Sequence, residues 1–119
     1  MSEKSVSQLI EEQSQIQELI QTILIDQEQI NQLRLKHKQA SQAEQSIEKM
    51  KDDEKIWSCG AGGFFLLTSV KEMRETLSEE KNMCKQEQTE LSKHVEESQK
   101  LLHSLDPHDV YKLQQQYLQ

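Results

Sequence analysis

The chain has very few of the residues that form turns and fill packed interiors. Its 119 residues include 3 glycines and 1 proline, and aromatic residues make up only 4% of the sequence. A compact enzyme needs loops that carry a cleft and bulky residues that fill a core, so this shortage argues against an enzyme. Glutamine and glutamate dominate the polar positions, and both favour helices. The composition therefore predicts a single domain, residues 1–119, built of long helices.

Basic charge, long apolar runs and paired cysteines are scarce as well. The formal net charge is −7, which makes nucleic acid and anionic membrane surfaces poor partners. The apolar stretch 61–67 is too short to span a bilayer, and residues 1–5 lack the apolar core of a signal peptide. The two cysteines, Cys59 and Cys84, form no CxxC motif. A cytoplasmic protein with reduced thiols is expected.

Residues 5–51 contain neither glycine nor proline and repeat their apolar residues at heptad spacing. This spacing predicts a long helix with an apolar stripe, which needs a partner along its length because such a helix is not stable alone. One register of the stripe contains Leu9, Ile16, Ile23, Ile30, His37 and Glu44, and the other contains Leu19, Asp26, Leu33, Ala40 and Ile47.

Residues 56–68 have a different pattern. Two short β-prone runs, 56–59 and 64–68, flank the segment 60–63, which holds every glycine of the chain. Short apolar runs on either side of a glycine cluster predict a β-hairpin.

A second helix is predicted over residues 69–105. It opens with Ser69 and Glu72, which are spaced as a capping box, and it ends before Pro107. Residues 106–119 are expected to form a short tail or a final short helix capped by Asp106. The heptad of the second helix contains Val70, Leu77, Cys84, Leu91, Ser98 and Leu105.

The two heptads match when the chain folds back at Gly62. Residues equidistant from that glycine then face each other, and these pairs include Ile47 with Leu77, Ala40 with Cys84, Asp26 with Ser98, and His37 with Glu87. Glu44 would face Glu80, so we expect those carboxylates to turn outward or the local register to differ. The predicted fold is mainly α: a long antiparallel coiled-coil hairpin with a short β-hairpin at the helix–helix junction.

No chemical motif in the chain is complete. The segment 60–63 is glycine-rich, but a phosphate-binding loop continues with Lys and Ser or Thr, whereas Phe64 and Phe65 follow here. The four histidines lack the spacing of a helical metal site. Cys84 on the seam is expected to be buried, and packing is also favoured for Cys59. We therefore expect no catalytic residue, no cofactor and no metal.

Two groups of apolar residues remain as candidate interaction surfaces. A two-stranded hairpin leaves its edges open, so its apolar residues are expected to contact other subunits; these are Ile56, Trp57, Phe64, Phe65, Leu66 and Leu67. At the free ends of the helices, the second group either packs together or stays partly exposed to hold apolar segments of another protein. It contains Val6, Leu9, Ile10, Leu101, Leu102 and Leu105.

A series of short motifs resembles the β class of prefoldin subunits, and the eukaryotic subunit 1 group in particular, over roughly residues 10–105. The motifs are Gln29–Leu33 late in the first helix, Ile47, Asp52 and Asp53 ahead of Trp57, and then Gly60, Gly62, Phe65, Leu67 and Ser69, leading through Lys71 and Glu72 to Leu77. Gly63 stands where the family pattern suggests a larger or basic residue, and the tail after residue 105 matches no family feature.

The resemblance implies a heterohexamer of α-class and β-class prefoldin subunits whose β-hairpins join into barrels. It implies that the helix ends hold unfolded clients, notably actin and tubulin chains, and pass them to the cytosolic chaperonin without ATP use. It also favours client contact over mutual packing for the end residues. The alternative is a structural coiled-coil subunit of another prefoldin-like or cytoskeletal complex.

Overall fold

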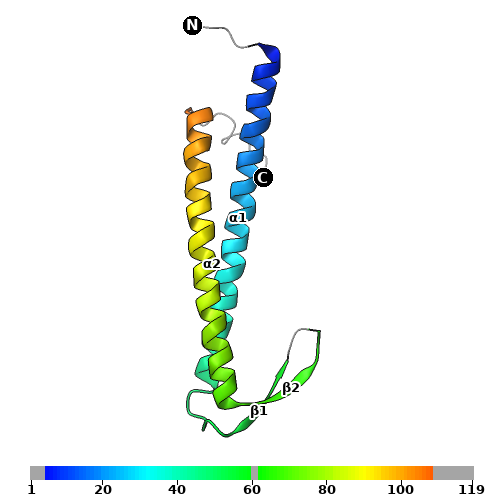
Figure 1. Cartoon of the computed structure of the whole chain (residues 1–119), viewed down its shortest axis with the longest axis vertical. Coiled ribbons are helices and arrows are strands. Elements are labelled where there is room, and N and C mark those ends of the chain that lie inside the picture. The colour runs from blue at the N-terminus through cyan, green and yellow to red at the C-terminus, as the bar shows by residue number, and fades with distance from the viewer. Residues whose placement is uncertain (1–4, 60–61, 109–119) are drawn as a thin grey trace. The chain divides into compact units, whose positions relative to one another are not determined.

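The computed structural model describes residues 5–59 and 62–108. Along the chain, helix α1 (Val6–Ser46) is followed by strands β1 (Lys55–Cys59) and β2 (Phe65–Ser69) and by helix α2 (Val70–Leu105), as Figure 1 shows. The strands pair in antiparallel fashion. Two long helices with a short β-hairpin between them confirm the predicted fold class. The predicted tail or final helix lies, apart from its first residues, outside the described part of the chain.

The chain divides into two compact units, and each contains part of both helices. The helical unit comprises Met1–Asn31 and Thr89–Gln119, and the hairpin unit comprises Gln32–Gln88. The early half of α1 is thus grouped with the late half of α2, and the late half of α1 with the early half of α2. This is the order that antiparallel helices require.

The helical unit has an apolar core drawn from both helices. Its buried members are Ile16, Ile20, Ile23 and Ile30 of α1 and Val95 and Leu102 of α2, with Leu19, Leu24, Leu91 and Leu105 packed against them. Burying each such side chain contributes about 1.5–3 kcal/mol. The predicted heptad supplies Ile16, Ile23 and Ile30 of this core on α1. On α2 the buried apolar residues are Val95 and Leu102, whereas the predicted Leu91 and Leu105 are only partly buried.

A polar group interrupts the apolar seam of the helical unit. Asp26 and Ser98 are both buried, as expected for facing seam positions. The Asp26 carboxylate contacts Nδ1 of His94, which lies one helical turn before Ser98. The seam carboxylate is therefore satisfied by the neighbouring turn of α2.

The hairpin unit has its own core of Ala40, Ile47, Val70 and Leu77, with Ala43, Met50, Ile56 and Met73 packed against it. Cys84 is buried, as predicted. The Glu44 carboxylate, which the heptad places opposite Glu80, pairs with the Lys81 ammonium, Oε1 to Nζ at 3.3 Å. The predicted contact of His37 with Glu87 is not confirmed, since the buried Nε2 of His37 has no hydrogen-bond partner within the described ranges.

Side chains of serine cap the starts of both helices. The Glu72 amide donates to Ser69 Oγ at 3.1 Å, so the predicted start of α2 is confirmed. At α1, the Gln8 amide donates to Ser5 Oγ and the Ser5 amide donates to Gln8 Oε1, at 3.2 and 2.9 Å. This reciprocal capping box matches the S-x-x-Q pattern and was missed in the sequence.

Helix α1 ends at Ser46, earlier than the predicted residue 51. Beyond it the backbone bonds tighten to three-residue spacing, from the Ile47 amide to the Glu44 carbonyl and from the Met50 amide to the Ile47 carbonyl. No glycine or proline marks this end. Arg74 of α2 contacts the carbonyls just beyond this end.

Candidate interaction surfaces

The register of the β-hairpin sorts its side chains onto two faces. Residues directly opposite each other in an antiparallel pair share a face. Ile56 opposite Thr68 and Ser58 opposite Leu66 form one face, and Ile56 packs on the core of the hairpin unit. The other face carries Lys55, Trp57 and Cys59 opposite Ser69, Leu67 and Phe65, and we refer to Trp57, Cys59, Phe65 and Leu67 as the outer face.

The outer face is apolar and uncovered in the described structure. Trp57 is 69% exposed, Phe65 is 70% exposed and Leu67 is 52% exposed. Cys59 is exposed too, so the expectation that it packs within the chain is wrong: it lies beside Phe65 on the face that the chain's own core does not reach. A monomeric protein seldom leaves a cluster of large apolar side chains like this one in water.

The remaining predicted hairpin residues lie outside this face. Phe64 is exposed ahead of β2, and Leu66 is exposed although it shares the face of the half-buried Ile56. The described sheet has two strands, so each strand also has one edge without a partner. Such an edge is a template for pairing with another chain.

Two glycines shape the hairpin turn. Gly62 and Gly63 have φ angles of 88° and 81°, a region that residues with a side chain enter only with strain. A Cβ at Gly63 would meet nothing within 4 Å, so backbone conformation, rather than space, requires glycine there. Gly60 lies outside the described residues.

The predicted end residues divide into exposed and buried members. Val6, Leu9 and Ile10 are exposed on the first turns of α1, and Leu101 is exposed near the end of α2. We refer to these four residues as the end group. Leu102 is 4% exposed within the core of the helical unit, and Leu105 packs against that core. Burial removes Leu102 from any accessible surface, because its side chain turns toward α1.

One hollow of the hairpin unit contains a cysteine. It has a volume of about 250 Å³ and is lined by Leu33, Lys36, Thr76, Glu79, Glu80, Met83, Cys84 and Glu87. The buried Cys84 shares this lining with three glutamates, and no histidine lines the hollow as a base. Within residues 5–59 and 62–108, no group of three or more histidine, cysteine or acidic side chains is placed to hold a metal. Neither described helix has a stretch long and apolar enough to cross a membrane.

The fold and the outer face together define a coiled-coil hairpin of the prefoldin type, with an uncovered β-hairpin where its helices join. A family model described as prefoldin subunit matches residues 7–117, and the chain belongs to this family. No curated protein and no solved structure matches the chain.

Proposed function

We propose that the chain is a β-class subunit of a heterohexameric prefoldin, similar to the eukaryotic subunit 1. In this proposal the complex acts in the cytoplasm, holds unfolded proteins such as actin and tubulin, and delivers them to the cytosolic chaperonin. It uses no ATP and catalyses no reaction. Membership of the prefoldin subunit family supports the proposal.

The observation that carries the proposal is the outer face. Burying Trp57, Phe65 and Leu67 contributes about 1.5–3 kcal/mol for each side chain. Association costs roughly 4–15 kcal/mol in lost freedom. One outer face supplies roughly 4.5–9 kcal/mol, which falls within the range of that cost, and faces contributed by both partners supply roughly 9–18 kcal/mol. The hairpin therefore suits pairing with a similar apolar hairpin of another α-class or β-class subunit.

The end group supplies the proposed contact with clients. Its four side chains are apolar and at least half exposed, which suits transient contact with apolar segments of a non-native chain. Each contact is weak, but contacts from several subunits act together through their high effective concentration. Such binding holds a client without imposing a fold on it.

The test is a double substitution, Leu9→Glu with Leu101→Glu, in the assembled complex. We expect at least a several-fold loss in suppression of actin aggregation, measured by light scattering, with the same complex mass. The matched control is Ile25→Glu, because Ile25 is 57% exposed on α1 and lies outside the end group. The control is expected to keep full suppression.

An equal loss in the Ile25→Glu control, or full suppression by the double variant, would contradict client contact by the end group. An assembled wild-type complex that leaves actin aggregation unchanged would favour the structural alternative, a coiled-coil subunit of another prefoldin-like or cytoskeletal complex.

A further inference from the structure

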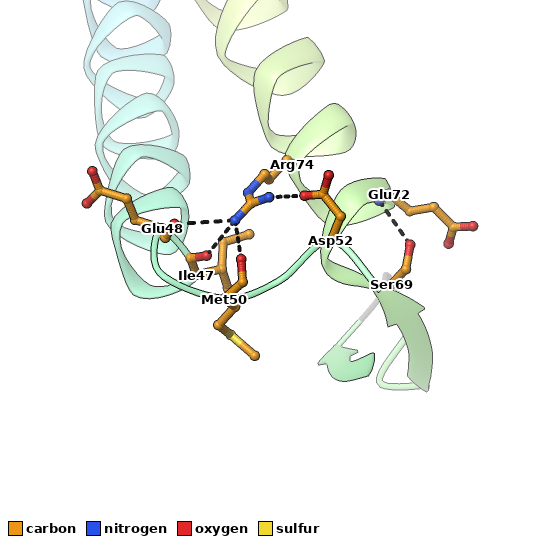
Figure 2. A network of polar contacts seen from close by, with 7 residues as sticks. All are labelled: Ile47, Glu48, Met50, Asp52, Ser69, Glu72 and Arg74. Atoms are coloured by element: carbon orange, nitrogen blue, oxygen red, sulfur yellow. Dashed lines mark hydrogen bonds and ion pairs between the residues drawn. The ribbon is translucent and has the colours of Figure 1, made fainter. Parts of the chain in front are cut away.

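One arginine binds the segment that joins α1 to the hairpin. Nη2 of Arg74, in the second turn of α2, donates to the carbonyl oxygens of Ile47, Glu48 and Met50 at 3.1, 3.3 and 2.6 Å. Nη1 of the same guanidinium contacts the Asp52 carboxylate. Figure 2 shows all four partners converging on this side chain.

Arginine is suited to this position by its chemistry. The carbonyls just beyond Ser46 lie where α1 has ended, so helical bonds no longer satisfy all of them. A guanidinium offers five donors in one rigid plane and stays charged at any ordinary pH. The three donors of a lysine ammonium have no such fixed geometry. Arg74 therefore acts as a cap for α1 that comes from a different helix.

The start of α2 binds the later residues of the same segment. The Val70 amide donates to the Glu54 carbonyl at 2.9 Å, and the Lys71 amide donates to the Asp52 carbonyl at 3.2 Å. Residues 47–54 are thus bound both to the first amides of α2 and to Arg74. We refer to residues 47–54 as the bracket.

The bracket leads directly into the hairpin. Strand β1 begins at Lys55, the residue after the bracket, and strand β2 runs without a break into α2 at Val70. Val70 is fully buried, which fixes the β2 connection. The β1 connection runs through the bracket, which Arg74 and the first amides of α2 hold, and Ile56 of β1 also packs on the core. Arg74 is the side chain that binds the bracket between Ile47 and Asp52.

We infer that Arg74 is the positioning residue of the assembly surface: it locks the bracket and thereby sets the direction in which the outer face meets a partner subunit. The inference rests on the proposed function, which makes the outer face a subunit interface. A hairpin already held in its bound direction loses less freedom when it associates, so its affinity is higher.

Because the contact between Arg74 and Asp52 is partly exposed, its role in positioning can be tested apart from its contribution to folding stability. The side chains of Arg74 and Asp52 are 36% and 65% exposed, and ion pairs in such surroundings contribute little to folding. The apolar core of the hairpin unit contains neither residue. Loss of the guanidinium should therefore loosen the bracket, while Ile47 and Met50 stay packed at the core and both helices stay packed.

The experiment compares Arg74→Gln and Arg74→Lys with wild type in complexes made by co-expression with prefoldin-type subunits. The matched control is Arg34→Gln, because Arg34 is the other arginine of the chain and is exposed on α1. Native mass spectrometry measures subunit dissociation, amide hydrogen exchange measures motion of the bracket and β1, and circular dichroism measures melting of the helices.

For Arg74→Gln we expect at least tenfold weaker association and faster amide exchange in the bracket and β1, with helix melting within a few degrees of wild type. Association and amide exchange of Arg74→Lys should lie between those of Arg74→Gln and wild type, since a lysine keeps one charged contact to Asp52. Arg34→Gln should match wild type in all three measurements.

Unchanged association of Arg74→Gln, beside a wild-type chain that assembles, would overturn this inference and leave the proposed function standing. Helix melting that falls in parallel with association, for Arg74→Lys as well, would reduce Arg74 to an ordinary stabilising residue and also overturn it. A wild-type chain that forms no complex would overturn the proposed function and this inference together.

Discussion

At the scale of the residue, Asp26 is the least expected member of the helical core. It is 7% exposed and lies among the isoleucines of α1, where an unpaired carboxylate would be strongly unfavourable. Its contact with His94 offsets that penalty. A single polar pair within an apolar seam also disfavours registers that would separate it. The pair therefore favours the observed alignment of α1 with α2 in this unit.

Removing one partner of this pair should destabilise the fold, whereas removing both should not. We expect His94→Ala to lower the free energy of unfolding by about 1–3 kcal/mol, because Asp26 stays buried without its partner. Combining Asp26→Leu with His94→Ala should recover most of that loss. Urea unfolding at neutral pH measures both changes. Lys93→Ala, at the exposed neighbouring position, is the control, and an equal loss there would contradict the argument.

The sequence predicts part of this residue-scale picture. The heptad places Asp26 and Ser98 on the seam, and both are buried. The heptad does not identify His94 as the partner of Asp26, because a seam side chain can contact residues one turn before or after the position that faces it. Arg74 was missed for a related reason: its acceptors are backbone carbonyls, which carry no side-chain signature in a sequence.

At the scale of the element, capping determines where the helices begin. Ser69 Oγ accepts a hydrogen bond from the Glu72 amide, one of the first-turn amides of α2 that have no partner within the helix. This cap also lies at the point where β2 passes into α2. The side chain of Ser69 therefore stabilises both the start of the helix and the end of the hairpin.

Ser69→Ala tests this cap. We expect a loss of about 1 kcal/mol in the free energy of unfolding, because one amide of the first turn loses its acceptor. Ser78→Ala is the matched control, at an exposed position inside α2, and should change stability by less than about 0.5 kcal/mol. Thermal melting of the two variants measures the difference. Equal melting temperatures would show that Ser69 does not act as a cap.

The elements were predictable to different degrees for physical reasons. Periodicity predicts both helices, and the end of α2 at Leu105 agrees with the structure. The glycine cluster predicts the hairpin, with strands within a residue of those observed. The end of α1 was not predictable, because no glycine or proline marks it and the Arg74 side chain that binds the carbonyl of Ile47 lies 27 residues away in sequence. The sequence predicts apolar hairpin residues open to other subunits, but which face stays uncovered was not predictable, since both faces of the hairpin carry apolar residues.

At the scale of the whole molecule, the chain buries its helical seams but not its hairpin. Each unit has its own apolar core, and the described residues place nothing on the outer face. A two-stranded hairpin is marginal in water without further packing. Partner subunits that bind the folded hairpin would stabilise it by mass action. We therefore expect the hairpin to be stabilised by assembly with other prefoldin subunits.

The most direct test of that assembly is to purify the tagged chain from its native cell and determine the mass and composition of its complex by native mass spectrometry. The account predicts one heterohexamer that contains this chain together with other prefoldin-type α-class and β-class subunits. A monomer, a homo-oligomer, or a complex with cytoskeletal components and without prefoldin-type chains would contradict it.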